Sequence, residues 1–154
     1  MSSPRLNPLI TSSNLIQLFA EFSNKIVEAG LEKSLVMLVK IRASQINGCA
    51  RCLQMHTHEA RKQGESEDRI VMLDAWRESP EYTARERAAL AWTEALTLLA
   101  ATRAPDDVYD QVKAQFSDEE TVKLTLMINV INAWNRIGVG SRLGYLTDSK
   151  RTAA

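Results

Sequence analysis

The chain has 154 residues, a length that suits one domain with a single hydrophobic core, so we expect one domain over residues 1–154. Its 19 basic and 19 acidic side chains balance to a formal charge of zero and are mixed along the sequence. No stretch collects enough lysine and arginine for a phosphate-binding surface, which disfavours nucleic acid as a partner. No apolar run approaches the roughly 20 residues needed to cross a bilayer, which disfavours a membrane protein.

Residues 1–7 lack the charged start and apolar core of a secretory signal, so the sequence predicts a cytoplasmic protein. In that reducing compartment, a pair of nearby cysteines is more typical of catalysis or metal binding than of a permanent crosslink. We expect the two ends of the chain, residues 1–7 and 147–154, to be frayed.

Apolar residues recur at helical spacing through the first half of the chain, where breaks separate four segments. The first has its apolar stripe at positions 15, 19, 22 and 26 and stops at Gly30. The second spans 32–47, the third spans 49–64, and a short fourth begins at Ser66 and ends at Ser79-Pro80.

Two capping boxes mark the starts of helices in the second half of the chain. Thr83 with Glu86 opens a fifth helix, and a short sixth follows Pro105. Ser117 with Glu120 opens the longest helix, which runs from about residue 122 to 139. No sustained alternation of polar and apolar residues suggests a strand. The pattern therefore predicts an all-α bundle of about six to seven helices.

The longest helix is apolar on most sides, with one narrow polar stripe at Thr125, Asn129, Asn132 and Arg136. Such a helix is normally buried on most sides, and a chain of this size has little interior for it. We therefore predict a subunit interface and a homo-oligomer. The alternative is a central core helix with a single solvated stripe.

The only two cysteines form the pair Cys49-Ala50-Arg51-Cys52, which is followed by His56. At about 100° per residue, Cys49, Cys52, His56 and Glu59 share one stripe of a helix. His58 points to the opposite side, so these histidines and cysteines do not form a tetrahedral zinc site within one helix. With no second ligand pair in the chain, we expect neither a metal nor a cofactor.

The position of the cysteines in the first turn of a helix favours redox chemistry, because free N–H groups and the helix dipole lower a thiol pKa there. His56 lies one turn beyond Cys52 and is placed to exchange a proton with it. Glu59 is a possible relay partner that orients the imidazole. Alternatively, the cysteines are small core residues, His56 is a structural group, and Glu59 is a solvated carboxylate or pairs with Lys62.

One stretch runs from Leu38 through Ser44-Gln45-Ile46-Asn47-Gly48 and the cysteine pair to His56. This stretch closely resembles the AhpD-like branch of the carboxymuconolactone decarboxylase family. The resemblance continues at 75–78, 86–92 and 132–136, and so covers most of the chain. It implies an all-α homo-oligomer, often a trimer or hexamer, and a hydroperoxide reductase that uses no metal or haem.

In the scheme that the resemblance implies, Cys52 attacks the peroxide and Cys49 resolves the product to a disulfide. A dithiol donor, of the thioredoxin or lipoyl type, then restores both thiols, and His56 belongs to the proton relay. The decarboxylase branch generally lacks the cysteine pair and fits this sequence less well.

Two positions depart from the family pattern. The relay glutamate, twelve residues before the first cysteine, is Met37 here, and a histidine between the cysteines is Arg51. Neither side chain can act as a base at neutral pH, although Arg51 would favour a thiolate. The departure at Met37 supports an alternative: a redox-responsive oligomer, or a slow thiol–disulfide exchange protein, that turns over no peroxide.

Overall fold

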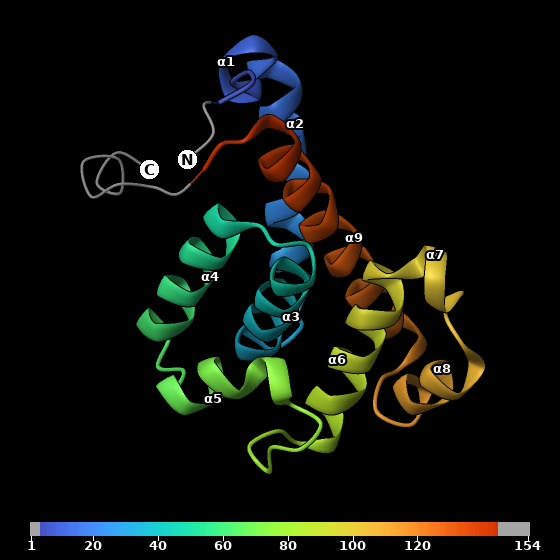
Figure 1. Cartoon of the computed structure of the whole chain (residues 1–154). Helices are drawn as coiled ribbons and strands as arrows, with labels where there is room; N and C mark the ends of the chain where they lie inside the picture. Colours follow the sequence, from blue (N-terminus) through green and yellow to red (C-terminus); the bar gives the residue numbers. More distant parts are fainter. Residues whose placement is uncertain (1–3, 145–154) are drawn as a thin grey trace.

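The computed structural model describes residues 4–144, and this part of the chain contains helices, turns and no strand (Figure 1). The predicted all-α fold is confirmed. The elements are α1 (Pro8–Thr11), α2 (Ser13–Val27), α3 (Lys33–Ile46), α4 (Ala50–Lys62), α5 (Glu67–Val71), the 3₁₀ turn η1 (Met72–Ala75), α6 (Ala84–Thr97), α7 (Leu99–Thr102), α8 (Asp106–Lys113) and α9 (Asp118–Ser141).

The seven predicted segments correspond to α2 to α6, α8 and α9, and the fourth of them also covers η1. The unpredicted elements α1 and α7 have four residues each, which is too short to show a helical repeat in the sequence. Both capping boxes are present. The backbone N–H of Glu86 donates to Thr83 Oγ1 at 3.2 Å, and that of Glu120 donates to Ser117 Oγ at 3.2 Å.

Helix α9 is the central element of the fold, because it packs against α2, α3, α4, α6 and α8 of its own chain. Leu124 and Ile128 are completely buried there, and the indole of Trp92 donates to Thr125 Oγ1 at 3.0 Å. Most of α9 is thus buried within its own chain, in line with the alternative of a central core helix, although Asn132 of the expected solvated stripe is buried and Val122 and Val139 are exposed. The homo-oligomer stays a prediction that α9 by itself does not require.

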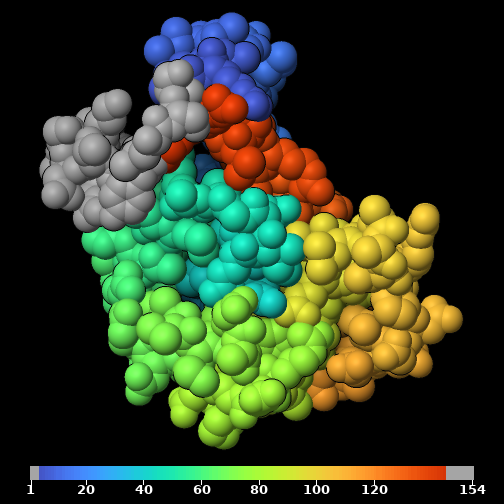
Figure 2. Space-filling model, viewed as in Figure 1, coloured from blue at the N-terminus to red at the C-terminus, as the bar shows by residue number. Residues whose placement is uncertain are grey.

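Helix α2 buries less of its apolar stripe than the sequence suggests. Ile26 is buried and the Phe19 ring contacts the tilted ring of Trp134, with centroids 4.8 Å apart, but Leu15 and Phe22 are 62% and 46% exposed. The reason is visible in Figures 1 and 2: α1 and the start of α2 project with the end of α9 beyond the other helices. The core contacts of α2 therefore come from Phe19 onward, on the face that carries Phe19 and Ile26.

Residues 1–3 and 147–154 of the predicted frayed ends lie outside the described residues. Within residues 4–7, the backbone N–H of Arg5 donates to the carbonyl oxygen of Ser141 at 3.1 Å, and the Asn7 side chain caps α1. Among the described helices, none is long and apolar enough to span a membrane.

Candidate active site

The turn between α3 and α4 brings the cysteines to the start of α4. Gly48 adopts a φ of +64°, a left-handed conformation that suits glycine, and lets the chain reverse direction. Cys49 is the N-cap of α4, so this helix begins one residue later than predicted, and its sulfur accepts the backbone N–H of Cys52 at 3.4 Å. The two cysteines form a disulfide, with Cα atoms 5.3 Å apart.

A cluster of amides anchors this turn to α9. The side-chain amide of Asn47 donates to the amide oxygens of Asn132 and Asn135, at 3.0 Å each. In turn, Asn135 donates to Ser44 Oγ at 3.0 Å and Asn132 donates to Thr97 Oγ1 at 2.9 Å. Buried polar groups that are satisfied in this way rigidify a structure. The Ser-Gln-Ile-Asn-Gly motif therefore positions the cysteine pair.

Gly138 of α9 allows the disulfide to lie against the helix backbone. A Cβ at this position would lie 3.1 Å from Cys49 Sγ and 3.8 Å from Cys52 Sγ, and the first distance is tighter than ordinary contact. Both cysteines are buried beneath this glycine, at 2% and 7% exposed. The sequence analysis missed Gly138, since no local pattern links it to residues almost ninety positions earlier.

A cavity of about 620 Å³ opens beside the disulfide, between α2, α4 and α9. Its walls are mostly apolar and include Val27 of α2 and Val130 and Trp134 of α9. Cys52 lines this cavity, whereas Cys49 does not. A cavity of this size and character suits an organic molecule of moderate size.

His56 and Glu59 line the same cavity, as their helical spacing predicts. His56 Nδ1 lies 3.7 Å from Glu59 Oε2, which is an ion-pair distance longer than a hydrogen bond. Among the described residues, this buried nitrogen has no hydrogen-bond partner. Burial lowers the pKa of His56, an effect that Glu59 partly opposes. The contact with His56 in turn lowers the pKa of Glu59. At neutral pH the imidazole is therefore neutral and able to accept a proton.

Lys40 of α3 is a cavity residue that the sequence analysis missed. Its pKa is lowered by burial, and the nearby Glu59 carboxylate counteracts this. The sequence does contain a signal that could have identified Lys40. Lys40 interrupts the run from Leu35 to Ile41, whose other six residues are each at most 2% exposed. A lone lysine in such a run is expected to reach a polar site.

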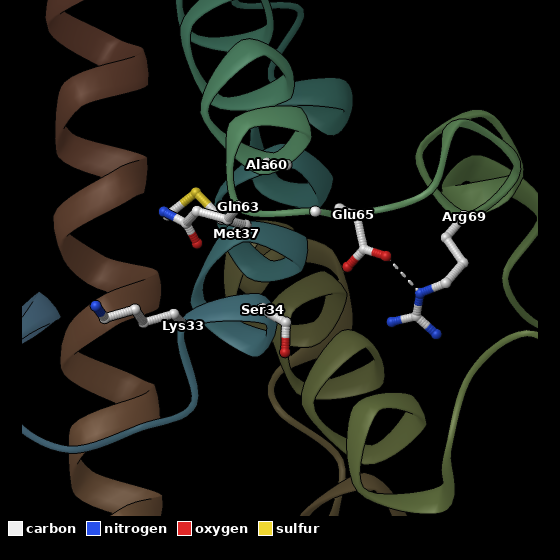
Figure 3. Close-up of a pocket in the computed structure, with 8 residues that line it drawn as sticks. Lys33, Ser34, Met37, Ala60, Gln63, Glu65 and Arg69 are labelled. Carbon is white, nitrogen blue, oxygen red and sulfur yellow. Dashed lines mark hydrogen bonds and ion pairs between the residues drawn. The ribbon is translucent and has the colours of Figure 1, made fainter.

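Met37 lies outside the cysteine cavity. It is 2% exposed and contributes to a separate pocket of about 440 Å³, together with Lys33, Gln63 and Arg69 (Figure 3). His58 is exposed and does not line the cysteine cavity either. Within residues 4–144, no group of three His, Cys, Asp or Glu side chains is placed to hold a metal ion.

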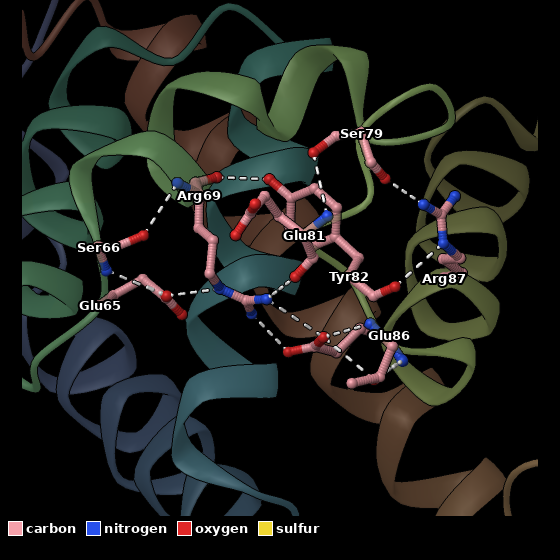
Figure 4. A network of polar contacts seen from close by, with 9 residues as sticks. Glu65, Ser66, Arg69, Ser79, Glu81, Tyr82, Glu86 and Arg87 are labelled. Atoms are coloured by element: carbon pink, nitrogen blue, oxygen red, sulfur yellow. Dashed lines mark hydrogen bonds and ion pairs between the residues drawn. The ribbon is translucent and has the colours of Figure 1, made fainter.

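The other segments of the family motif build the scaffold. The Trp76 indole and the Arg42 guanidinium both donate to Glu94 Oε1, at 2.8 Å each. Arg69 pairs with Glu65 at 2.7 Å and with Glu86 at 2.6 Å (Figure 4). These contacts join α3, α5 and α6 and lie apart from the cysteine cavity.

Comparison with known proteins identifies relatives over most of the chain. The sequence profile of the carboxymuconolactone decarboxylase family matches residues 14–95. The uncharacterized protein YdfG of Bacillus subtilis is 46% identical over 112 residues, which cover 73% of this chain and 76% of YdfG.

Solved structures of other proteins also resemble this chain. ATU0492 of Agrobacterium tumefaciens, a protein of unknown function suggested to be the antioxidant defence protein AhpD, superposes with a TM-score of 0.92 at 44% identity, over 95% of this chain and 100% of its own. The debrominase Bmp8 shares the fold, with a TM-score of 0.79 at 19% identity over 92% of this chain and 76% of its own. The AhpD-like resemblance of the sequence is confirmed.

Proposed function

Because this chain belongs to the carboxymuconolactone decarboxylase family, we propose that it is an AhpD-like reductase of organic hydroperoxides that works through Cys49 and Cys52. One observation carries the proposal. Cys52 opens onto an apolar cavity that also contains His56, while its partner Cys49 is covered by α9. This asymmetry favours Cys52 as the residue that meets the peroxide.

The cycle balances with the two thiols and one external reductant. The Cys52 thiolate attacks the outer oxygen of ROOH, the O–O bond breaks, and ROH leaves after protonation. The resulting Cys52 sulfenic acid is attacked by the Cys49 sulfur, which forms the disulfide and releases water. A dithiol donor, of the thioredoxin or lipoyl type, then reduces the disulfide and is itself oxidised.

His56 serves as the proton acceptor for the Cys52 thiol in this proposal. Its lowered pKa keeps the imidazole neutral, and Glu59 at 3.7 Å stabilises the imidazolium that forms. Glu59 thereby takes the part of the carboxylate that Met37 cannot supply. A homo-oligomer, a trimer or a hexamer, belongs to the proposal as well. The exposed apolar residues of α1 and α2, Ile10 and Leu15 among them, support it.

A second candidate is a redox-responsive protein, or a slow thiol–disulfide exchange protein, that turns over no peroxide. The observation that favours it is Met37, which is buried and replaces the relay glutamate. Such a protein would be oxidised once, with the disulfide altering a contact between helices or subunits, and would not consume peroxide continuously.

The deciding experiment counts free thiols after the reduced protein is mixed with cumene hydroperoxide. We expect the wild type to lose both thiols rapidly, Cys49→Ser to accumulate a sulfenic acid that dimedone traps, and Cys52→Ser to react no faster than free cysteine. Continuous peroxide consumption with dithiothreitol then separates an enzyme from a switch. Thiol loss no faster than that of free cysteine in the wild type would overturn the proposal.

A further inference from the structure

The cysteine cavity contains a cation that no described residue neutralises by direct contact. Lys40 is half-buried, yet among residues 4–144 its ammonium makes no hydrogen bond and no ion pair within 4.0 Å. By contrast, the half-buried side chains of Arg42, Arg69 and Arg85 each pair with carboxylates at 2.6–2.8 Å. Burying an unpaired charge costs free energy. A bound partner from outside the chain would offset this cost for the Lys40 ammonium.

The charged groups around Lys40 do not neutralise it, so an anionic partner is favoured. Among residues 4–144, the ionisable groups that line the cavity with Lys40 are Arg51, His56 and Glu59. With His56 neutral, two positive groups face one carboxylate, so this described part of the cavity carries a net positive charge. Glu59 is close enough to influence Lys40, but its own contact is with His56 at 3.7 Å. A bound anion would therefore be attracted on balance.

Lys40 and the Cys52 sulfur lie on different helices that line the same cavity. Glu59, whose carboxylate interacts electrostatically with Lys40, follows Cys52 by seven residues on α4, a rise of about 10 Å. Apolar side chains of α2 and α9, including Val27 and Ile131, line the cavity along with these groups. The arrangement thus fits a molecule with a reactive group at one end, an apolar body and an anionic group at the other.

We propose that the cavity selects organic hydroperoxides in which an apolar chain separates a carboxylate from the peroxide group, with the Lys40 ammonium holding that carboxylate. Hydroperoxides of long-chain fatty acids belong to this class. The inference rests on the proposed peroxide reductase function and adds its substrate class. Lys40 acts as a specificity residue here, and the peroxide chemistry stays at Cys52.

The first test compares a linoleic acid hydroperoxide with its methyl ester, below the micelle concentration and with dithiothreitol as the uncharged reductant. We expect the acid to be preferred in kcat/KM, and Lys40→Met to reduce this preference about tenfold. The ratio is the readout, because any general effect of the substitution on Cys52 or His56 cancels in it. Lys33→Met is the control, since it removes the same charge from α3 outside the cavity.

A second test measures binding without turnover. The disulfide form is titrated with decanoate and with 1-decanol, and the fluorescence of Trp134 in the cavity wall reports binding. We expect Lys40→Met to weaken decanoate binding about tenfold and to leave 1-decanol unchanged.

The two tests separate the inference from the function it rests on. If neither hydroperoxide is consumed but decanoate binding depends on Lys40, the reductase proposal fails and the carboxylate site stands. If the acid and the ester are consumed equally, or if Lys33→Met changes the preference as much as Lys40→Met, the inference is wrong.

Discussion

Two clusters of ionisable side chains, one around Arg69 on α5 and α6 and the other in the cysteine cavity, differ in how their charges are satisfied. Around Arg69, the guanidinium pairs with Glu65 and Glu86, and the Tyr82 hydroxyl donates to the backbone oxygen of Arg69 (Figure 4). In the cysteine cavity, His56 Nδ1 is buried with no hydrogen-bond partner in the described part of the chain, and the Glu59 carboxylate is 3.7 Å away.

The difference separates groups that hold the fold from groups that are available for chemistry. In a satisfied network, the charged groups bind one another and join the helices, so they are not available to bind a substrate. Unsatisfied groups beside a cavity cost stability and can accept a proton or a ligand. The substitutions below should therefore affect reactivity in the cavity and stability around Arg69.

The largest effect is expected for His56→Gln, which removes the proton acceptor from the cavity. The rate of Cys52 oxidation by cumene hydroperoxide should fall about a hundredfold, the lower range for loss of a general base. Stopped-flow kinetics measure this rate. The control is His58→Gln, on the exposed side of the same helix, which should react like the wild type. Equal rates for the two variants would remove His56 from the mechanism.

Arg69→Met should break the satisfied cluster and lower the free energy of unfolding by about 2 kcal/mol. Breaking a fully buried pair costs more, but these side chains retain some exposure, at 18% for Arg69 and 13% for Glu86. Urea denaturation gives the value. Arg61→Met, which removes the exposed pair with Glu67, should leave the free energy of unfolding nearly unchanged. Thiol reactivity per folded molecule should stay the same in both variants.

Gly138→Ala should destabilise the disulfide form by about 1 kcal/mol, because the added Cβ would lie 3.1 Å from Cys49 Sγ. Gly140→Ala is a matched control on the same helix. Its Cβ would meet nothing within 4 Å among residues 4–144, and alanine is the better helix former. Urea denaturation of both oxidised variants tests this, and a Gly138→Ala protein as stable as Gly140→Ala would contradict the close packing.

The smallest effect concerns pH. Because burial lowers the pKa of His56, the unfolded chain takes up its proton at a higher pH than the folded chain does. The unfolded state therefore binds more protons just below the ordinary pKa of 6.5, and the free energy of unfolding should fall as the pH is lowered through this range. His56→Gln should lose less stability than the wild type between about pH 7 and 5.5 in urea titrations. An equal loss would show that His56 does not titrate as described.

Local signals in the sequence predicted the regular elements well. The capping boxes at Thr83 and Ser117 depend on residues three positions apart, so they could be identified without tertiary information. The shared face of Cys52, His56 and Glu59 likewise follows from helical geometry alone. The four-residue helices α1 and α7 were missed, because one turn carries no periodicity.

The sequence by itself therefore determined the all-α class, the main helices and the reactive stripe of α4, since each depends on contacts within a few residues. Only the tertiary structure decided that α9 passes through the centre of its own chain, that Gly138 covers the cysteines, and that Lys40 reaches the cavity. These features join residues far apart in the sequence. Their positions depend on how helices pack, which the pattern of any single helix does not specify.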